Sequence, residues 1–205
     1  MTSCDSVGTS IATKHLDADL SGTPVDQMKY RSMVGALMYL TASRPDIVHA
    51  TCYCARYQAK PTEKHLTAVK RIFRYLKDTI YMGLWYPKDT GFKLTAISDS
   101  DHVGCLDLRK STSGGIQFLG GDKLVSWSSK KQDCTSMSSV EAEYHFIKEK
   151  VEKSIVKLFF VGTEYQLTDM FTKALPEERF KYLVRRLGMR CLTPEELEVL
   201  ANEST

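Results

Sequence analysis

The 205-residue sequence predicts an α/β protein, α+β in its overall arrangement, in which a helical N-terminal region precedes a sheet with flanking helices. Two observations predict this class. Apolar residues recur at helical spacing up to about residue 77, and after Pro87 they alternate with polar residues as in strands. The composition, with 42% hydrophobic and 26% charged residues, is typical of a globular chain with one domain or two small ones.

Three helices are expected in the N-terminal region. Residues 1–27 are rich in Ser, Thr, Gly and Asp, show no period, and are expected to form a flexible entry segment. Apolar spacing then predicts a helix over residues 28–41. Proline suits the first turn of a helix and disfavours a helical residue before it, so further helices are expected over residues 45–57 and 61–77. Thr62 is a possible cap for the last of these.

The helix over residues 61–77 is strongly amphipathic. Its apolar residues fill one arc, and the opposite arc carries a set of basic residues. The basic set consists of Lys64, Lys70, Arg71, Arg74 and Lys77. The net charge is only +3, so the chain has no strong overall field, and two interpretations stay open for this face. It is either a solvated helix surface or a contact for the phosphates of a nucleic acid.

Strands are expected next. Alternating residues predict them over residues 93–98, 115–119 and 123–128, with a tight hairpin at Gly120-Gly121-Asp122. A helix should then begin at the capping box that opens at Ser138.

Further elements are expected towards the C-terminus. An apolar run predicts a strand over residues 155–161. Short helices should follow from about Glu164 to Pro176, over residues 177–187, and from Pro194 onwards.

Asp99 and Asp101 follow the strand predicted over residues 93–98. A carboxylate at the end of a central strand is where an α/β sheet usually presents its site. Acidic residues that converge from separate elements can hold a pair of Mg²⁺ ions for phosphodiester hydrolysis. Both residues could equally cap a loop, and the pattern alone does not decide between these interpretations.

Glu143 and Asp169 are the other candidate ligands. Glu143 lies three residues after Val140 and four before Ile147, on the apolar stripe of its helix, so it needs a partner or a cation. Glu141 points outward and is explained by the capping box. Asp169 lies near the start of a helix, where its charge favourably meets the helix dipole, which is a complete structural explanation.

Motifs spread over nearly the whole chain resemble, in order, the C-terminal part of Copia-type LTR retrotransposon Pol polyproteins of plants. The motifs are YRSMVGALMYLT over residues 30–41, SRPDI over 43–47, HLTAVKRIFRYL over 65–76, STSG over 111–114, LVSWSSKKQ over 124–132, EAEY over 141–144 and FTKALP over 171–176. Each motif alone is weakly specific, and together they are highly specific.

The resemblance implies two modules and a tail. Residues 28–87 would be a helical remnant of the thumb and connection of a reverse transcriptase. Residues 91–176 would be a truncated ribonuclease H-like domain, with a mixed sheet, and residues 177–205 a C-terminal helical tail.

Ribonuclease H domains cut the RNA strand of an RNA–DNA hybrid with four acidic residues and two Mg²⁺ ions. By motif, Asp99 corresponds to the first acid, Glu143 to the second and Asp169 to the fourth. The resemblance therefore makes these three the expected catalytic residues and metal ligands, with Mg²⁺ as the expected cofactor.

The sequence departs from the family after Glu143. The third acid belongs to a Cys-Asp-Asn or Cys-Asp-Ser motif, which is absent here, and EAEY runs directly into a motif that lies much later in the family. A strand and several helices are therefore expected to be missing, with Tyr144 at the junction. Helical phase is kept across the junction, so one continuous helix is expected over residues 139–153. The strand over 155–161 should then pair in parallel beside strand 93–98.

These departures predict a Pol fragment without catalytic activity. The polymerase motif Tyr-x-Asp-Asp is absent, and a Mg²⁺ pair that lacks one bridging carboxylate should bind weakly. The expected partners are nucleic acid, an RNA–DNA hybrid in the family, and the rest of a Pol polyprotein. Two alternatives remain: a residual nucleic-acid-binding module that uses helix 61–77, and a remnant that docked on the polymerase half through apolar surface on residues 28–57.

The cysteines predict a reducing environment. The six residues are scattered and form no paired CxxC motifs of the zinc-binding type. The sequence shows no secretory signal and no apolar run of membrane-spanning length. We therefore expect an intracellular protein of the cytoplasm or nucleus, with free thiols and no membrane partner.

Overall fold

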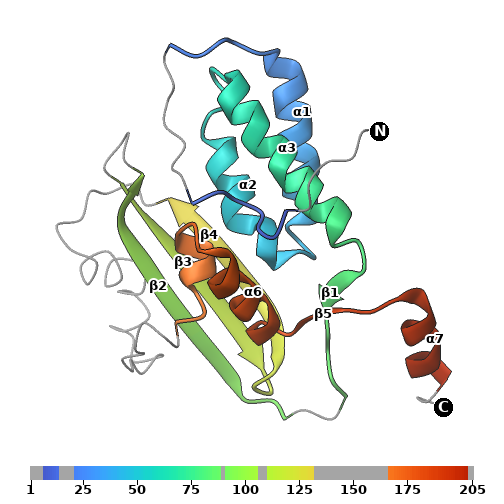
Figure 1. Ribbon diagram of the computed structural model, residues 1–205. Coiled ribbons are helices and arrows are strands. Elements are labelled where there is room, and N and C mark those ends of the chain that lie inside the picture. The colour runs from blue at the N-terminus through green and yellow to red at the C-terminus, as the bar shows by residue number, and fades with distance from the viewer. Residues whose placement is uncertain (1–6, 14–20, 89–90, 106–109, 132–165, 203–205) are drawn as a thin grey trace.

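The computed structural model describes the following parts of the chain: residues 7–13, 21–88, 91–105, 110–131 and 166–202. The described elements form a helical layer from the N-terminal region and an antiparallel sheet, with shorter C-terminal elements packed beside them (Figure 1). The predicted α/β class is confirmed.

The helical layer contains α1 (Gln27–Leu40), the 3-10 helix η1 (Pro45–Ile47), α2 (Val48–Ala55) and α3 (Glu63–Asp78). α1 and α3 match predicted helices, and η1 and α2 together cover the one helix predicted over residues 45–57, with outer boundaries within about two residues. The helices pack through side chains that are almost fully buried: Tyr30, Val34 and Leu37 of α1, Ala50 and Cys54 of α2, and Val69, Ile72 and Tyr75 of α3. This apolar seam fixes the face that α3 turns outward.

Thr62 is the N-cap of α3, as expected, and it is hydrogen-bonded to a residue that the sequence did not single out. The backbone N–H of Thr62 donates to Nδ1 of His65 at 3.1 Å. The His65 ring is fully buried and stacks on Tyr57, with ring centroids 4.2 Å apart. The pair forms a capping box in which histidine takes the place usually held by Glu or Gln.

The first described residues pack against this layer. The backbone N–H of Val7 donates to the carboxylate of Asp78 at 3.0 Å, and the hydroxyl of Ser10 donates to the backbone carbonyl of Asp46 at 2.9 Å. Thr9 and Ser10 are buried. This part of the expected entry segment therefore lies along α3 and η1.

The sheet consists of β2 (Leu94–Cys105), β3 (Lys110–Leu119) and β4 (Lys123–Lys131) in the order β2-β3-β4, with both pairs antiparallel. The predicted hairpin between the last two is present. Gly120 and Gly121 take φ values of 68° and 89°, which glycine adopts without strain.

The prediction that the first strand ends at Ser98 is wrong. β2 continues through Asp99 and Asp101 to Cys105, because the polar first half of β3 pairs with it. The hydroxyls of Ser100 and Ser113 are hydrogen-bonded across the strands at 2.9 Å, and both residues are buried. Asp and Ser have low strand propensity, but a cross-strand partner decides the local structure here.

The C-terminal elements are α5 (Asp169–Thr172), α6 (Glu177–Arg186), β5 (Met189–Cys191) and α7 (Pro194–Asn202). β5 pairs antiparallel with β1 (Met82–Leu84), a ribbon that the sequence did not predict because three residues are too few to show a period. α7 stands apart from the other helices in Figure 1, and its Leu197 is 50% exposed.

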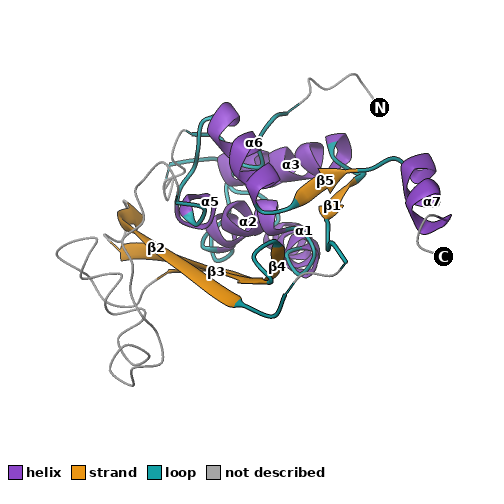
Figure 2. Ribbon diagram, turned by 90° about the horizontal axis from the view of Figure 1, so that it is seen from below, coloured by secondary structure: helices purple, strands orange, loops and turns teal. Residues whose placement is uncertain are grey.

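Helices cover one face of the sheet, as Figure 2 shows. α2 joins the two layers, and side chains cross between them. The Trp127 indole N–H on β4 donates to the Thr41 carbonyl at 2.9 Å, and the Arg56 guanidinium donates to the Thr112 hydroxyl on β3 at 3.1 Å. Asp99, whose carboxylate contacts α5, therefore lies on the face of the sheet that the helices cover.

Several predictions concern residues outside the described part of the chain. Glu143, the continuous helix over 139–153 and the parallel strand over 155–161 all lie there, so they stay predictions. The division into residues 28–87, 91–176 and 177–205 also stays a prediction. None of the described helices is long and apolar enough to cross a membrane.

Candidate acidic site on the sheet

Asp99 lies in the middle of β2, where its carboxylate meets α5. The hydroxyl of Thr172, on α5, donates to Oδ2 of Asp99 at 2.7 Å, and the same hydroxyl lies 3.3 Å from the Asp169 carbonyl. Asp99 is half-buried. The structure therefore brings the regions of two predicted acids together through a threonine.

Gly114 allows α5 to come this close. It lies directly opposite Asp99 in the β2–β3 register. A Cβ atom at this position would meet the Phe171 Cβ at 2.8 Å and the Thr172 Cγ2 at 3.0 Å, distances that require something to move. A glycine in a strand often marks such an approach, and here it sets the depth at which Thr172 reaches Asp99.

Asp169, the first residue of α5, is buried and neutralised by two basic side chains. Its Oδ1 lies 2.7 Å from Nζ of Lys173, one turn later, and its Oδ2 lies 3.4 Å from the Arg179 guanidinium of α6. The Lys173 contact is an ion pair whose alignment does not make a hydrogen bond. The Asp169 side chain is 5% exposed, so these ion pairs compensate most of its buried charge.

The segment before α5 is tied to the same sheet. The Gln166 side-chain amide donates to the Ser98 carbonyl at 3.2 Å, and the Thr168 hydroxyl donates to Oε1 of Gln166 at 2.6 Å. On the other side, the hydroxyl of Ser129 on β4 donates to the Phe171 carbonyl at 2.5 Å. α5 is therefore held to β2 and β4 by polar contacts as well as by its buried Phe171.

The residues that the structure describes do not fit a pair of Mg²⁺ ions. Among them, no group of three or more His, Cys, Asp or Glu side chains could hold a metal ion. Asp99 and Asp169 are the two predicted ligands in this part of the chain, and the carboxylate of Asp169 already faces Lys173 and Arg179. A dinuclear site needs carboxylates free to bridge two cations.

The predicted basic face of α3 is only partly exposed. Lys70 and Lys77 are exposed, whereas Lys64, Arg71 and Arg74 are half-buried. Arg71 donates to the carbonyl and the hydroxyl of Thr9, at 3.2 and 2.9 Å, and burial and the neighbouring Arg74 lower the pKa of its guanidinium. The expectation of a wholly open basic face is therefore wrong for Arg71, because residues 7–11 lie over it.

Sequence reasoning missed the residues that complete the acidic site. Gly114, Thr172, Lys173 and Arg179 lie outside the predicted set, although the first three belong to motifs that carried the resemblance. One signal was available: Lys173 follows Asp169 by four residues, a spacing that favours an ion pair on a helix.

Several known proteins are similar to this chain in sequence. The chain is 38% identical over 144 residues to the uncharacterized mitochondrial protein AtMg00810 of Arabidopsis thaliana, a match that covers 70% of this chain and 60% of that protein. It is 31% identical over 232 residues to the retrovirus-related Pol polyprotein from transposon RE1 of Arabidopsis thaliana, covering 85% of this chain and 16% of the polyprotein. It is 30% identical over 246 residues to the retrovirus-related Pol polyprotein from transposon RE2 of Arabidopsis thaliana, covering 92% of this chain and 17% of the polyprotein.

The chain is homologous to retrovirus-related Pol polyproteins from transposons of Arabidopsis thaliana and Nicotiana tabacum. It spans about one sixth of the length of the RE1 and RE2 polyproteins. No protein-family model matches it, and no solved structure matches it.

Proposed function

We propose that this Pol chain is the end of a reverse transcriptase region joined to an internally shortened ribonuclease H-like domain, and that it does not hydrolyse RNA–DNA hybrids. The observation that carries this proposal is the state of Asp169, whose buried carboxylate is neutralised by Lys173 and Arg179. A cation there would have to displace side chains that already compensate the charge.

The lengths of the alignments support the shortening. The RE2 match runs over 246 positions but covers 92% of 205 residues, about 189, so about 57 positions have no counterpart in this chain. The RE1 match runs over 232 positions and covers 85% of the chain, about 174 residues, so about 58 positions have no counterpart in this chain. The AtMg00810 match runs over 144 positions and covers 70% of the chain, so almost no position lacks a counterpart. A block of nearly constant size is what one internal deletion would produce.

Loss of the third acid supports the absence of hydrolysis. Two Mg²⁺ ions about 3.5–4 Å apart need shared carboxylates to offset their mutual repulsion. No Cys-Asp-Asn or Cys-Asp-Ser motif follows Glu143, so the shared ligand has no replacement in the expected place. Without any cation, Asp99 can hold α5 on the sheet through Thr172, and the charge of Asp169 is compensated by its two ion pairs.

The test is a hydrolysis assay with the full chain, an RNA–DNA hybrid and excess Mg²⁺, beside Asp99→Asn as the matched variant. We expect equal, background rates for both proteins. Thermal unfolding of the same samples should show no rise in Tm on adding Mg²⁺, because a ligand raises Tm only by binding the folded state. Cleavage that Asp99→Asn abolishes would overturn the proposal.

Nucleic-acid binding through α3 is a second candidate, favoured by the exposure of Lys70 and Lys77. Two exposed cations could each contact a phosphate, and such binding weakens as salt rises. Since Arg71 is engaged by Thr9, this face offers fewer contacts than its sequence indicates. The variant Lys70→Glu/Lys77→Glu should lose affinity for an oligonucleotide if this candidate is correct.

A further inference from the structure

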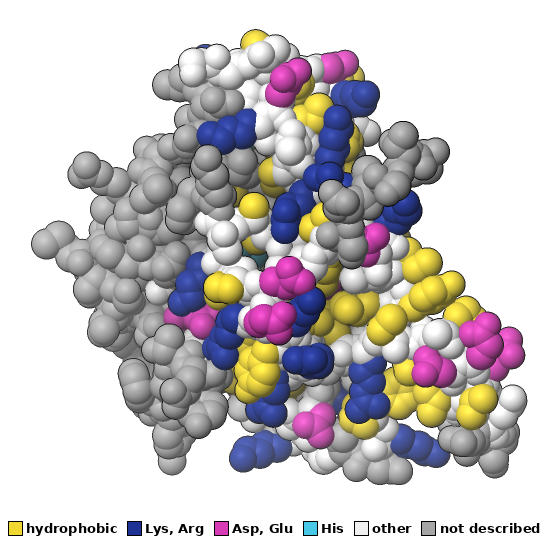
Figure 3. All heavy atoms as spheres, in the orientation of Figure 1, with side chains coloured by type: hydrophobic (Ala, Val, Ile, Leu, Met, Phe, Trp, Pro, Cys, Tyr) yellow, Lys and Arg dark blue, Asp and Glu magenta, His cyan; other side chains and the backbone are white. Residues whose placement is uncertain are grey.

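The segment from Arg179 to Pro194 carries only one sign of charge. It holds five basic residues and no acidic one: Arg179, Lys181, Arg185, Arg186 and Arg190. Arg179 and Lys181 face acidic partners, Asp169 and Glu177. The other three are exposed, and in the described part of the chain they take part in no ion pair. Figure 3 shows Lys and Arg side chains over α6, with Asp and Glu side chains among them, beside the hydrophobic side chains over β1 and β5.

Aromatic rings lie among these cations. The Arg190 guanidinium lies over the ring of Trp85, 5.2 Å from its centroid, and that of Arg179 lies 5.4 Å from the centroid of the Tyr182 ring. Tyr182 is 37% exposed, and Trp85 is half-buried. The surface therefore combines exposed cations with two aromatic rings, each of which has a guanidinium over it.

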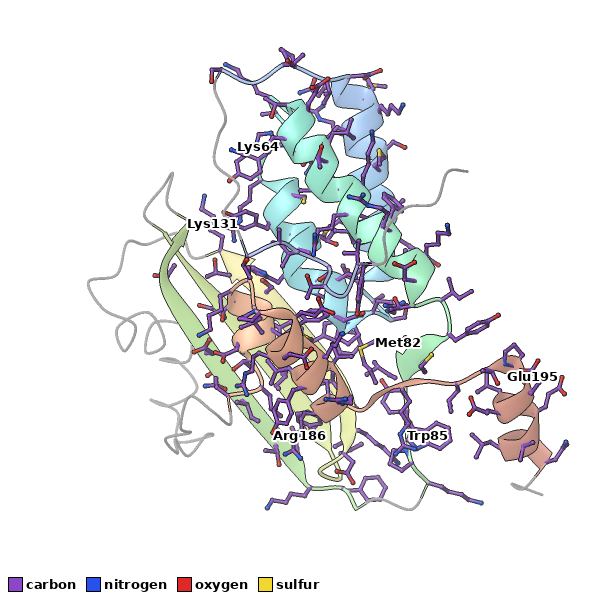
Figure 4. All side chains as sticks on the ribbon, viewed as in Figure 1. Lys64, Met82, Trp85, Lys131, Arg186 and Glu195 are labelled. Carbon is purple, nitrogen blue, oxygen red and sulfur yellow. The ribbon has the colours of Figure 1, made fainter. Side chains whose placement is uncertain are left out.

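Backbone hydrogen bonds connect Trp85 to the end of α6. The N–H of Trp85 donates to the Gly188 carbonyl at 2.9 Å, and the N–H of Gly188 donates to the Arg185 carbonyl at 3.1 Å. The end of α6 is thus connected directly to Trp85, the residue that follows β1. In Figure 4, Arg186 lies at the end of α6 and Trp85 on the neighbouring ribbon, while the acidic Glu195 lies out on α7.

We propose that this α6–β5 surface, made of Arg185, Arg186, Arg190, Trp85 and Tyr182, binds single-stranded nucleic acid. Guanidinium groups form charge-assisted hydrogen bonds to phosphates, and aromatic rings stack with unpaired bases of any sequence. The inference goes beyond the proposed function, because it needs neither the acidic residues nor Mg²⁺. It also differs from the α3 candidate, since the two surfaces share no residue.

Single strands fit this surface better than a membrane does. The apolar residues of α6 face inward, with Phe180, Leu183 and Val184 buried, so the exposed side of the helix has no aliphatic side chain to enter a bilayer. Tyr182 and Trp85 present rings instead, and rings stack only with bases that are not paired inside a duplex. Charge alone would not discriminate between these ligands.

The first experiment measures the fluorescence anisotropy of a labelled single-stranded oligonucleotide with the full chain. Arg185→Glu/Arg186→Glu is compared with Lys70→Glu/Lys77→Glu, which makes the same change of charge on α3. We expect a loss of about tenfold or more for the α6 variant and about threefold or less for the α3 variant. The slope of log K against log salt should fall by about 1.4 for the α6 variant, at about 0.7 per phosphate contact.

The second experiment tests stacking with Tyr182→Ala and two oligonucleotides of equal length, one normal and one abasic. Affinity for the normal strand should fall about fivefold or more, and affinity for the abasic strand should not change. Far-UV circular dichroism confirms that each variant is folded.

Three results would overturn the inference. One is an equal or larger loss for the α3 variant. Another is a preference for duplex over single strand that Tyr182→Ala leaves unchanged. The third is binding to vesicles containing an anionic phospholipid that competes with the oligonucleotide and is lost in the α6 variant. Failure of the hydrolysis test would not affect these outcomes, because they are read without Mg²⁺.

Discussion

Asp46 in the helical layer and Asp169 beside the sheet are both buried carboxylates with basic partners, yet they are held differently. Asp46 receives two hydrogen bonds from one guanidinium, from Arg44 Nε at 2.9 Å and from Arg44 Nη2 at 2.6 Å, and a third from the Tyr75 hydroxyl at 2.7 Å. Asp169 meets Lys173 and Arg179, whose side chains are 36% and 25% exposed. The side chain of Arg44 is only 10% exposed.

The difference separates a carboxylate held by one buried, bidentate partner from one held by two partly exposed partners. Arg44 also donates to the carbonyl and the hydroxyl of Thr79, so the Arg44–Asp46 pair is satisfied on both sides and joins η1 to the end of α3. Asp169 lacks a bidentate partner, and one of its two contacts is a long 3.4 Å pair.

The largest expected effect is that of Asp46→Asn. The change leaves the Arg44 guanidinium buried without its counter-charge, and breaking a buried pair on one side costs about 3–5 kcal/mol. Urea unfolding should show this loss as a lower midpoint with an unchanged m value. The double variant Arg44→Met/Asp46→Leu is the control, because removing both charges should restore much of the loss. A loss below about 1 kcal/mol for Asp46→Asn would show that the two carboxylates are held alike.

A smaller effect is expected from Gly114→Val. The added side chain would meet Phe171 and Thr172 and force α5 away from the sheet, and overpacking of this kind costs about 1–3 kcal/mol. Gly35→Ala on α1 is the matched control, since a Cβ there meets nothing within 4 Å and alanine favours the helix. Chemical denaturation of both variants measures the contrast. Equal stability of the two variants would mean that α5 does not rest on Gly114.

Asp169→Asn should lower the free energy of unfolding by less than Asp46→Asn, by about 1–2 kcal/mol. Its partners Lys173 and Arg179 are partly exposed, so their charges can be solvated by water when the carboxylate is lost. Thermal unfolding at low and high salt distinguishes this from the Asp46 case, since salt screens exposed pairs more than buried ones. We expect the loss of stability caused by Asp169→Asn to become smaller in high salt, and the loss of stability caused by Asp46→Asn to stay the same. An increase in stability would instead indicate that Asp169 remains a strained ligand.

The smallest effect concerns the thiols. Burial raises the pKa of the Cys54 thiol to about 12, so it stays protonated and unreactive near neutral pH. Cys191, on the β1–β5 ribbon, is exposed. Iodoacetamide followed by peptide mass mapping should modify Cys191 well before Cys54. Rapid labelling of Cys54 would show that the helical layer opens more readily than its packing indicates.

The sequence predicted the helical layer well because its determinants are local. Pro45 and Pro61 mark helix starts, and the apolar stripe of α3 sets its inward face. The acidic site depends on distant residues: Thr172 is 73 positions from the Asp99 that it contacts. A glycine in a strand, such as Gly114, can mark a close approach, but the sequence does not say which element approaches. Periodicity could not supply that information.

The length of β2 and the cover over Arg71 were missed for the same reason. Whether Asp99 and Asp101 are in a strand is decided by β3, and whether Arg71 is open is decided by Thr9, 62 residues away. A helical wheel shows which residues share a face, and it cannot show what else lies on that face. The candidate ligands were therefore easier to name than to place.

The β1–β5 ribbon also bears on how the chain is made. Leu84 pairs with Met189, 105 residues further along the sequence. A ribosome adds roughly 5–20 residues per second, so β1 emerges about 5–20 s before its partner strand exists. The helical layer can close during translation, whereas β1 has to wait until β5 has been synthesised. A nascent chain released early would expose the unpaired edge of β1 and invite aggregation.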